Sequence, residues 1–187
     1  MKKLIVAISG ASGVTYGVRI LEVLNKLKEI ETHLIISPSA ERIVKTECNI
    51  DNIDEIKRLA DIVHDFKDIG AKVASGSFLT EGMVVIPCSI KTLSGIANSY
   101  NENLIIRAAD VCLKERRKVV VVVRETPLHL GHIELMEKVT RIGGVILPPM
   151  PSFYHEPKNI DDIVNQTIGK VLDQFHIEHN LFKRWNG

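Results

Sequence analysis

Two segments of the chain combine small and hydroxyl-bearing residues in a pattern typical of anion binding. The first is Gly10-Ala11-Ser12-Gly13 and the second is Ser89-Ile90-Lys91-Thr92, and each opens a helical pattern. Glycines at such a junction let backbone N–H groups approach an anion, and a helix N-terminus favours negative charge. A tight turn with Ser12 as a helix cap, or an ordinary capped helix after Ser89, would explain the same residues. The two segments are therefore candidates for a phosphate site, with helix capping as the alternative.

A pair of opposite charges, Arg124 and Glu125, follows the most hydrophobic run of the chain, Val119–Val123. Charges at the end of a buried strand either pair with each other or face a ligand, and both interpretations stay open at this point. Arg107 and the cluster Lys114-Glu115-Arg116-Arg117 lie in a helical pattern with mixed signs. For most of that cluster a solvated helix face is the simpler interpretation.

The histidine and cysteine spacings do not predict a metal site. His129 and His132 would share one helical face, but no carboxylate takes an HExxH-like position and Gly131 lies between them. His176 and His179 have the same spacing at a polar helix end, and we expect them to be solvated. The three cysteines form no CxxC pair, which gives no zinc site and suits a reducing cytoplasm; they are Cys48, Cys88 and Cys112.

Alternating strand and helix patterns position these residues. The expected strands are short and apolar almost throughout, as strands covered on both faces are; they are Leu4–Ser9, His33–Ile36, Met83–Pro87, Val119–Val123 and Gly144–Leu147. The expected helices are Thr15–Leu27, Ala40–Glu47, Asp54–Asp61, Lys91–Ser99, Leu104–Glu115, Ile133–Ile142 and Asp161–Phe175. This alternation predicts an α/β fold with a doubly wound, mostly parallel sheet and helices on both faces. Because there is no linker or repeat, residues 1–187 are expected to form a single domain.

Ligands of such sheets bind beyond the carboxyl ends of the strands, where the segments described above should meet. The second strand ends at Ser37-Pro38-Ser39, so it offers no acid to hold the ribose hydroxyls of a dinucleotide. The first loop does not spell GxGxxG either. A mononucleotide such as FMN therefore fits this sequence better than NAD does.

Composition argues against two classes of partner. The 24 Lys and Arg nearly balance the 23 Asp and Glu, giving a formal charge of +1, so we expect no nucleic-acid partner. The longest apolar runs are far shorter than the roughly 20 residues of a membrane helix, so we expect no membrane association. The apolar start of the chain runs into a glycine-rich turn, which favours a first strand over a signal peptide. We expect a cytoplasmic protein.

A series of motifs, in order along nearly the whole chain, resembles one family. The motifs are Gly10-Ala11-Ser12-Gly13, Pro87-Cys88-Ser89-Ile90-Lys91-Thr92, Arg107-Ala108-Ala109-Asp110, Lys114-Glu115-Arg116-Arg117, Arg124-Glu125-Thr126-Pro127-Leu128, Phe153-Tyr154-His155 and Arg184-Trp185. Together they resemble the UbiX/Pad-type flavin prenyltransferases, formerly described as 3-octaprenyl-4-hydroxybenzoate or phenylacrylic acid decarboxylases. No single motif is specific, but the combination is.

The resemblance implies a Rossmann-like flavoprotein that assembles as a homododecamer, with active sites at subunit interfaces and no metal. Such proteins join a dimethylallyl group from dimethylallyl phosphate to N5 and C6 of reduced FMN. The prenylated FMN then serves partner decarboxylases of the UbiD type, in ubiquinone synthesis or in aromatic acid decarboxylation. The resemblance further implies that the C-terminal helix and tail contribute to the active site or to a subunit interface.

The resemblance also implies a role for individual residues. FMN would contact Gly10, Ala11, Ser12, Ser37, Ser89, Ile90, Lys91, Thr92 and Arg124. The prenyl phosphate would meet Tyr154 and Lys170, with Arg107, Lys114 and Arg124 nearby. The catalytic set would be Glu47 and Glu125 near the reacting flavin, Trp185 over the prenyl chain, and Ser12, Lys114 and Arg107. Without the resemblance, Trp185 would be a tail anchor, Tyr154 a packing residue and Glu47 a solvated helix-end charge.

The chain departs from the family pattern at two places. It has Asp68-Ile69-Gly70 where many members carry an aromatic residue, and Lys170 where Arg is frequent. A Lys binds phosphate as a point charge and lacks the bidentate fork of Arg.

Two other functions are alternatives. A flavin-dependent decarboxylase of the cysteine-peptide type would need a catalytic histidine in the first half of the chain, and His33 lies inside an expected strand. A flavin carrier, or a subunit that activates an aromatic acid decarboxylase, would need the FMN loops but not the phosphate-seeking cations.

Overall fold

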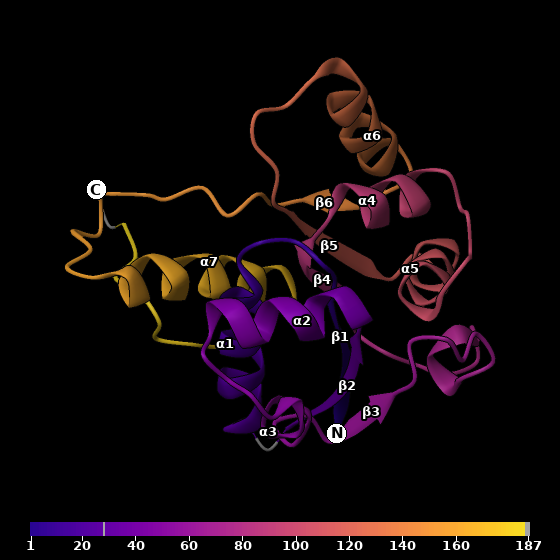
Figure 1. Cartoon of the computed structure of the whole chain (residues 1–187), viewed down its shortest axis with the longest axis horizontal. Helices are drawn as coiled ribbons and strands as arrows, with labels where there is room; N and C mark the ends of the chain where they lie inside the picture. The colour runs from indigo at the N-terminus through magenta and orange to yellow at the C-terminus, as the bar shows by residue number, and fades with distance from the viewer. Residues whose placement is uncertain (28, 186–187) are drawn as a thin grey trace.

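The sheet that organises the molecule is parallel throughout. The structure is a computed structural model that describes residues 1–27 and 29–185, and these residues form six strands in the order β3-β2-β1-β4-β5-β6 (Figure 1). The strands are β1 (Lys2–Ile8), β2 (Ile30–Ile36), β3 (Ile62–His64), β4 (Gly82–Cys88), β5 (Lys118–Val123) and β6 (Val145–Ile146). This is the strand order of doubly wound nucleotide-binding sheets. Successive strands are added toward one edge up to β3 and toward the other edge from β4 onward, so the order switches between β1 and β4.

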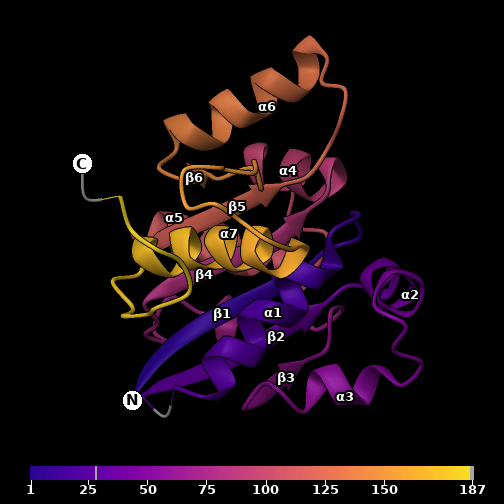
Figure 2. The same cartoon turned by 90° about the vertical axis from the view of Figure 1, so that its left-hand side faces the viewer.

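Helices cover both faces of the sheet (Figure 2). One face is covered by α1 (Val14–Asn25), α2 (Pro38–Glu47), α3 (Ile53–Lys57) and α7 (Ile160–Gln174). The other is covered by the 3-10 helix η1 (Lys72–Ala74), α4 (Ile90–Ala97), α5 (Leu104–Lys114) and α6 (Leu130–Arg141). In Figure 2, α1 and α7 lie side by side in front of the sheet, and their residues are in direct contact.

The two faces explain why the strands are apolar throughout. Along β1, Leu4, Val6 and Ile8 belong to the core under α1 and α7, whereas Ile5 and Ala7 belong to the core under α5. All five side chains are at most 1% exposed. Both sets of alternating positions are therefore buried, as the sequence predicted.

The predicted fold class is confirmed, and the expected elements are present with small shifts of their ends. The sequence reading missed β3 and η1, which are three residues each. The edge strand β3 gave no signal because its residues are half-buried or exposed, with Val63 41% exposed. Among the described residues, none of the helices has the length and apolarity needed to cross a membrane.

Candidate active site

The loop between β1 and α1 is fixed by a carboxylate from another helix. Gly13, at the N-cap of α1, has a left-handed φ of 91°, and no cap side chain bonds the helix start. Instead Glu47 Oε2, from the last residue of α2, accepts hydrogen bonds from the Gly13 and Val14 N–H groups at 2.8 and 3.3 Å. The alternative in which Ser12 caps α1 is therefore wrong, and Glu47, although exposed, is more than a solvated helix-end charge because it bonds the start of α1. A carboxylate at a helix N-terminus is electrostatically favourable.

The same loop approaches the end of β2 closely. A Cβ on Gly10 would lie 2.2 Å from Ser39 Oγ, so only glycine fits at that position. Ser39 Oγ is 3.0 Å from Ser37 Oγ, and Ser37 caps α2 by accepting from the Ala40 N–H. The loops after β1 and β2 are thus one packed unit, which brings Gly10 and Ser37 together as predicted.

Ser9 joins this unit to β4 across the point where the strand order reverses. Its side chain is buried, donates to the Pro87 carbonyl at 3.0 Å and accepts from the Ser89 N–H at 2.8 Å. Ser89 in turn caps α4, and its hydroxyl donates to Thr92 Oγ1 at 3.1 Å. The capped helix expected after Ser89 is therefore present. Ser9 was not predicted as a site residue, because a hydroxyl that links two loops has no local sequence signal.

The start of α4 and the end of β5 complete this edge of the sheet. The Arg124 N–H donates to the Cys88 carbonyl at 3.1 Å, which places Arg124 beside the start of α4. Burial raises the pKa of Tyr16, on the first turn of α1, and the positive charge of Arg124 opposes that rise. Ile90 is half-buried, whereas Lys91 is exposed and lies 3.6 Å from Glu102.

Arg124 and Glu125 do not form an ion pair with each other among the described residues. Glu125 is exposed, and its carboxylate accepts only from the N–H of the next residue, Thr126, at 3.1 Å. The interpretation of the pair as a structural salt bridge is therefore wrong. Both charges remain available to a ligand at the carboxyl edge of the sheet.

The two predicted cations of α5 each pair with a carboxylate of their own helix or its end. Arg107 pairs with Asp110 at 3.4 Å, and Lys114 pairs with Glu115. The Lys114 ammonium contacts the segment at Gly76, which precedes the start of β4. Lys114 therefore lies near the amino edge of the sheet, opposite the strand-end loops.

A third group of predicted residues gathers around α7. Residues 148–159, here called the arm, connect β6 to α7 and carry Tyr154. The Trp185 ring lies edge-on to Tyr154, with ring centroids 6.1 Å apart and an interplanar angle of 83°. Lys170 projects from α7 with its Nζ 4.0 Å from Asp173 Oδ2. The backbone of the arm projects away from the sheet (Figure 1).

One of the remaining histidines, His179, differs from the expectation that it is solvated. His179 is not solvated: its side chain is 3% exposed, and its Nε2 lies 3.1 Å from Asp173 Oδ1. The polar sequence around it concealed a tertiary contact with Asp173 and Arg184. His129 caps α6 at its start, and no group of three metal-ligating side chains forms among the described residues.

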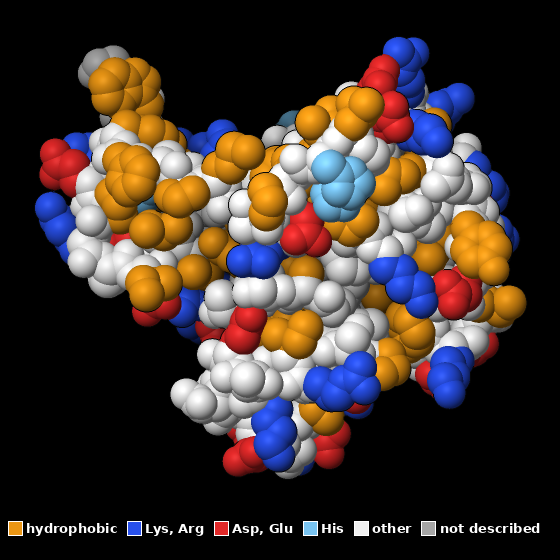
Figure 3. Space-filling model, turned by 45° about the horizontal axis from the view of Figure 1, so that its top comes forward, with side chains coloured by type: hydrophobic (Ala, Val, Ile, Leu, Met, Phe, Trp, Pro, Cys, Tyr) orange, Lys and Arg blue, Asp and Glu red, His pale blue; other side chains and the backbone are white. Residues whose placement is uncertain are grey.

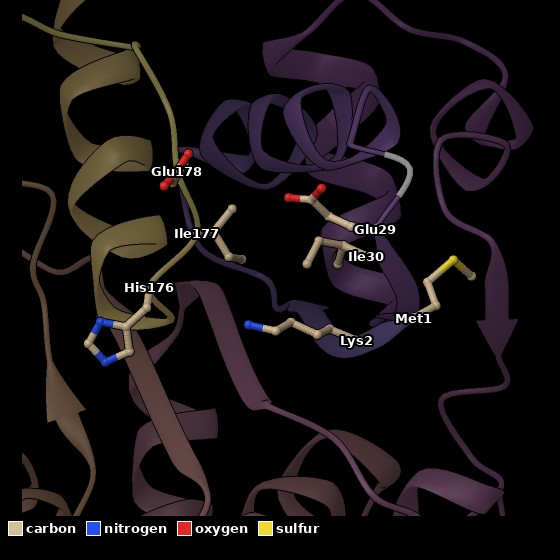
Figure 4. A pocket seen from close by; sticks show the side chains of 7 residues that line it. All are labelled: Met1, Lys2, Glu29, Ile30, His176, Ile177 and Glu178. Atoms are coloured by element: carbon tan, nitrogen blue, oxygen red, sulfur yellow. The ribbon is translucent and has the colours of Figure 1, made fainter.

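A cavity of about 650 Å³ lies at the amino edge, between the start of β1 and the end of α7 (Figure 4). Lys2, Glu29 and Ile177 extend into it. Its lining carries charged side chains of both signs, namely Lys2, Glu29 and Glu178. None of the predicted site residues lines this cavity, so the candidate site is the set of loops at the carboxyl edge.

A parallel sheet whose strand order switches between β1 and β4, with glycine and serine loops at that point, is the arrangement of nucleotide-binding α/β proteins. The family model described as "Flavoprotein" matches residues 1–172. The chain is 56% identical over 189 residues to flavin prenyltransferase UbiX of Escherichia coli K12, and the alignment covers 100% of both chains. The chain belongs to the UbiX family of flavin prenyltransferases and is, as predicted, a transferase.

Solved structures agree with this assignment. A dodecameric FMN-dependent UbiX-like decarboxylase from Escherichia coli O157:H7 superposes with a TM-score of 0.96 at 46% identity, covering 99% of this chain and 100% of that one. AnUbiX in complex with FMN and dimethylallyl pyrophosphate superposes with a TM-score of 0.95 at 45% identity, covering 100% and 98%.

Proposed function

We propose that this chain joins a dimethylallyl group from dimethylallyl phosphate to N5 and C6 of reduced FMN, making prenylated FMN. The observation that carries the proposal is the meeting of the glycine loop after β1 with the helix starts of α2 and α4 around the Ser9 link between β1 and β4. Helix N-termini bind phosphate through free N–H groups and their dipole. The FMN complex of AnUbiX, at 45% identity, supports FMN as the flavin.

The residues at these helix starts fit a flavin mononucleotide. Gly10 has no room for a side chain, so its own backbone stays accessible to a ligand at this loop. The Ser12 hydroxyl has no hydrogen-bond partner among the described residues and is half-buried. The proposed FMN contacts are Gly10, Ala11, Ser12, Ser37, Ser89, Ile90, Lys91, Thr92 and Arg124.

The chain's own groups would supply the remaining chemistry. When bound, reduced FMN supplies a nucleophilic N5. The C–O bond of the donor breaks with its electrons leaving on phosphate, and cations that neutralise this charge lower the barrier; we assign this to Arg107, Lys114, Arg124 and Lys170. The aromatic faces of Tyr154 and Trp185 would stabilise the developing allyl cation by about 2 kcal/mol when desolvated. The proposal requires no metal.

Bond formation at N5 would displace the N5 proton, and closure of the new ring at C6 would add a proton to the alkene of the prenyl group and remove one from C6, so a carboxylate that accepts and returns a proton is needed. Glu125 is the better candidate, because within residues 1–27 and 29–185 its carboxylate accepts only from the neighbouring Thr126 N–H. The Glu47 carboxylate already accepts hydrogen bonds from the Gly13 and Val14 N–H groups, which fix it on the loop before α1. We therefore assign proton acceptance to Glu125, and to Glu47 the orientation of the Gly13 loop.

The scattered positions of Lys114, Tyr154 and Trp185 support a homo-oligomeric site, in which a second copy completes the donor pocket. Several large apolar side chains are also exposed in a single chain. On the arm and the tail these are Phe153 and Trp185, at 71% and 70%, and on α6 they include Leu130 at 69%. Figure 3 shows exposed hydrophobic side chains gathered on the projection at its upper left. The E. coli O157:H7 relative is dodecameric, and we propose the same assembly here.

The product, partner and location are part of the same proposal. Prenylated FMN would pass to a UbiD-type decarboxylase. A cytoplasmic location is supported by the free state of Cys48, Cys88 and Cys112. Residues 1–187 would act as one domain, because α7 packs on α1 and on β5.

Mass spectrometry of the flavin tests the function. The protein is incubated anaerobically with reduced FMN and either dimethylallyl phosphate or dimethylallyl pyrophosphate, without Mg²⁺. We expect a released flavin heavier by one dimethylallyl unit with the monophosphate. Transfer from the pyrophosphate alone would overturn the proposed donor. Unmodified FMN with both donors would contradict the transfer itself and favour a flavin carrier.

A further inference from the structure

One carboxylate, that of Asp173, fastens the C-terminal tail (residues 175–185) to α7. Its Oδ1 accepts from Arg184 Nη2 at 2.6 Å, and its Oδ2 accepts from Arg184 Nη1 at 3.1 Å. The Leu181 N–H donates to His179 Nδ1 at 3.3 Å, so the His179 proton sits on Nε2 and is donated to Asp173 Oδ1 at 3.1 Å. We call Asp173, His179 and Arg184 the clasp.

The clasp is packed against α7 as well as hydrogen-bonded to it. The His179 and Phe182 rings are 5.5 Å apart and both lie over Gly169. A Cβ at position 169 would come within 2.4 Å of the Phe182 ring and 2.6 Å of His179. The missing side chain therefore permits the close approach of the tail. The hydrogen bond from Arg184 holds the pKa of Asp173 below its usual value, so the clasp is charged at neutral pH.

The clasp also lies beside the proposed donor residues. Trp185 follows Arg184 directly and meets Tyr154 of the arm edge-on. Lys170 lies one helical turn before Asp173, with its Nζ 4.0 Å from Oδ2, at the outer limit of an ion pair. Because Arg184 bonds both oxygens of Asp173, the Lys170 ammonium is held only loosely and keeps donors for another anion.

We infer that Asp173 is a positioning residue for prenyl transfer: through the clasp it holds Trp185 against Tyr154 and keeps this aromatic pair beside Lys170. The inference rests on the proposed roles of Tyr154, Lys170 and Trp185. If Asp173 acted only through its charge, its removal would have the opposite effect on phosphate binding. Removal of the Asp173 charge would leave Lys170 and Arg184 more positive and strengthen phosphate binding, whereas loss of position weakens it.

Two variants release the tail by different means. Asp173→Asn removes the charge that holds Arg184, and Gly169→Ala pushes Phe182 and His179 away without changing any charge. The second substitution also raises helix propensity, so α7 itself is not weakened. Glu137→Gln is the matched control, because it breaks an ion pair with Arg141 on exposed α6. Trp185 is the only tryptophan of the chain, so its fluorescence reports on the tail alone.

We expect both variants, purified as full chains with FMN, to lower the anisotropy of Trp185 and to increase its quenching by acrylamide. The KM for dimethylallyl phosphate should rise about three- to tenfold, while kcat and FMN affinity change less than about twofold. The control should match the wild type. Unchanged Trp185 fluorescence in both variants would overturn the inference, and so would a mobile Trp185 with an unchanged or lower KM. A wild-type protein that transfers no dimethylallyl group would refute the proposed function separately, because the fluorescence still decides whether the clasp holds the tail.

Discussion

The strand-end loops and the arm with the tail both carry predicted site residues, but they are built differently. The loops are joined by buried hydrogen bonds from three strands, and Ser9, 1% exposed, links two of them. The aromatic pair formed by arm and tail is largely exposed, with Trp185 at 70% and Tyr154 at 45%, and depends on the single carboxylate of Asp173. One chain thus preforms the proposed flavin cradle, whereas the proposed donor pocket stays open for further contacts.

The largest expected effect tests the chemistry at the preformed region. In Glu125→Gln, the side chain keeps its size and loses its basicity, so FMN binding should persist while prenylated FMN forms at least about 100-fold more slowly. Flavin mass spectrometry gives the rate and fluorescence titration gives the FMN affinity. Glu137→Gln, an exposed glutamate paired with Arg141, is the control. Turnover within a few-fold of the wild type would remove Glu125 from the role of base.

A steric substitution tests how tightly the loops are built. Gly10→Ala places a Cβ 2.2 Å from Ser39 Oγ and should weaken FMN binding and lower the free energy of unfolding by about 1–3 kcal/mol. Urea unfolding and FMN titration measure the two effects.

The double variant Gly10→Ala/Ser39→Gly supplies the control, since it removes the side chain that the new Cβ meets. We expect it to recover most of the loss in FMN affinity. No recovery would mean that the backbone at Gly10, rather than its contact with Ser39, is what the flavin needs.

A conservative change tests the open region. Lys170→Arg supplies a planar fork with two aligned donors for phosphate, so the KM for dimethylallyl phosphate should fall about two- to fivefold with kcat unchanged. Lys183→Arg, on the tail, is the control, because it shows whether a guanidinium added near α7 changes this KM without contacting the donor phosphate. An unchanged KM would place the donor phosphate away from Lys170.

The smallest expected effect concerns a pair of histidines outside both regions, His33, which is buried, and His64, which is half-buried. His33 Nδ1 lies 2.9 Å from His64 Nε2, and His33 Nε2 lies 2.8 Å from Glu31 Oε1. Burial lowers the pKa of both histidines below the ordinary value of 6.5; the bond to Glu31 opposes this for His33, while Lys3, Lys72 and Asp68 contribute smaller charge effects. The hydrogen bond from His33 lowers the pKa of Glu31, whose carboxylate stays charged down to more acidic pH.

The sign of the pH dependence follows from these directions. The unfolded chain binds protons at His33 and His64 more readily than the folded chain, so stability is full above about pH 6.5 and declines as the pH falls toward the lowered folded values. Urea unfolding between pH 7.5 and 5 checks this. The variant His33→Gln should flatten the decline, and an equally steep decline in that variant would assign it to other groups.

Much of the fold and part of the site were readable from the sequence, because their signals are local. The apolar strands, the GASG loop and the Ser89 cap each depend on residues that are close together in the chain. The short edge strand β3 was missed because its half-exposed residues carry no continuous apolar run. His179 was assigned to solvent because the chain leaves the helix after Gln174, so helical spacing does not reveal Asp173 and Arg184 as its partners.

The sequence by itself determined the doubly wound sheet, the loops that line its carboxyl edge and, through its motifs, the family. The tertiary structure alone decided that Glu47 caps the helix that starts 33 residues before it, that Ser9 joins β1 to β4, and that Lys114 lies near the opposite edge. The physical reason is the range of the interactions. Strand and helix formation follow from short-range periodicity, whereas a hydrogen bond between distant segments exists only after the sheet has brought them together.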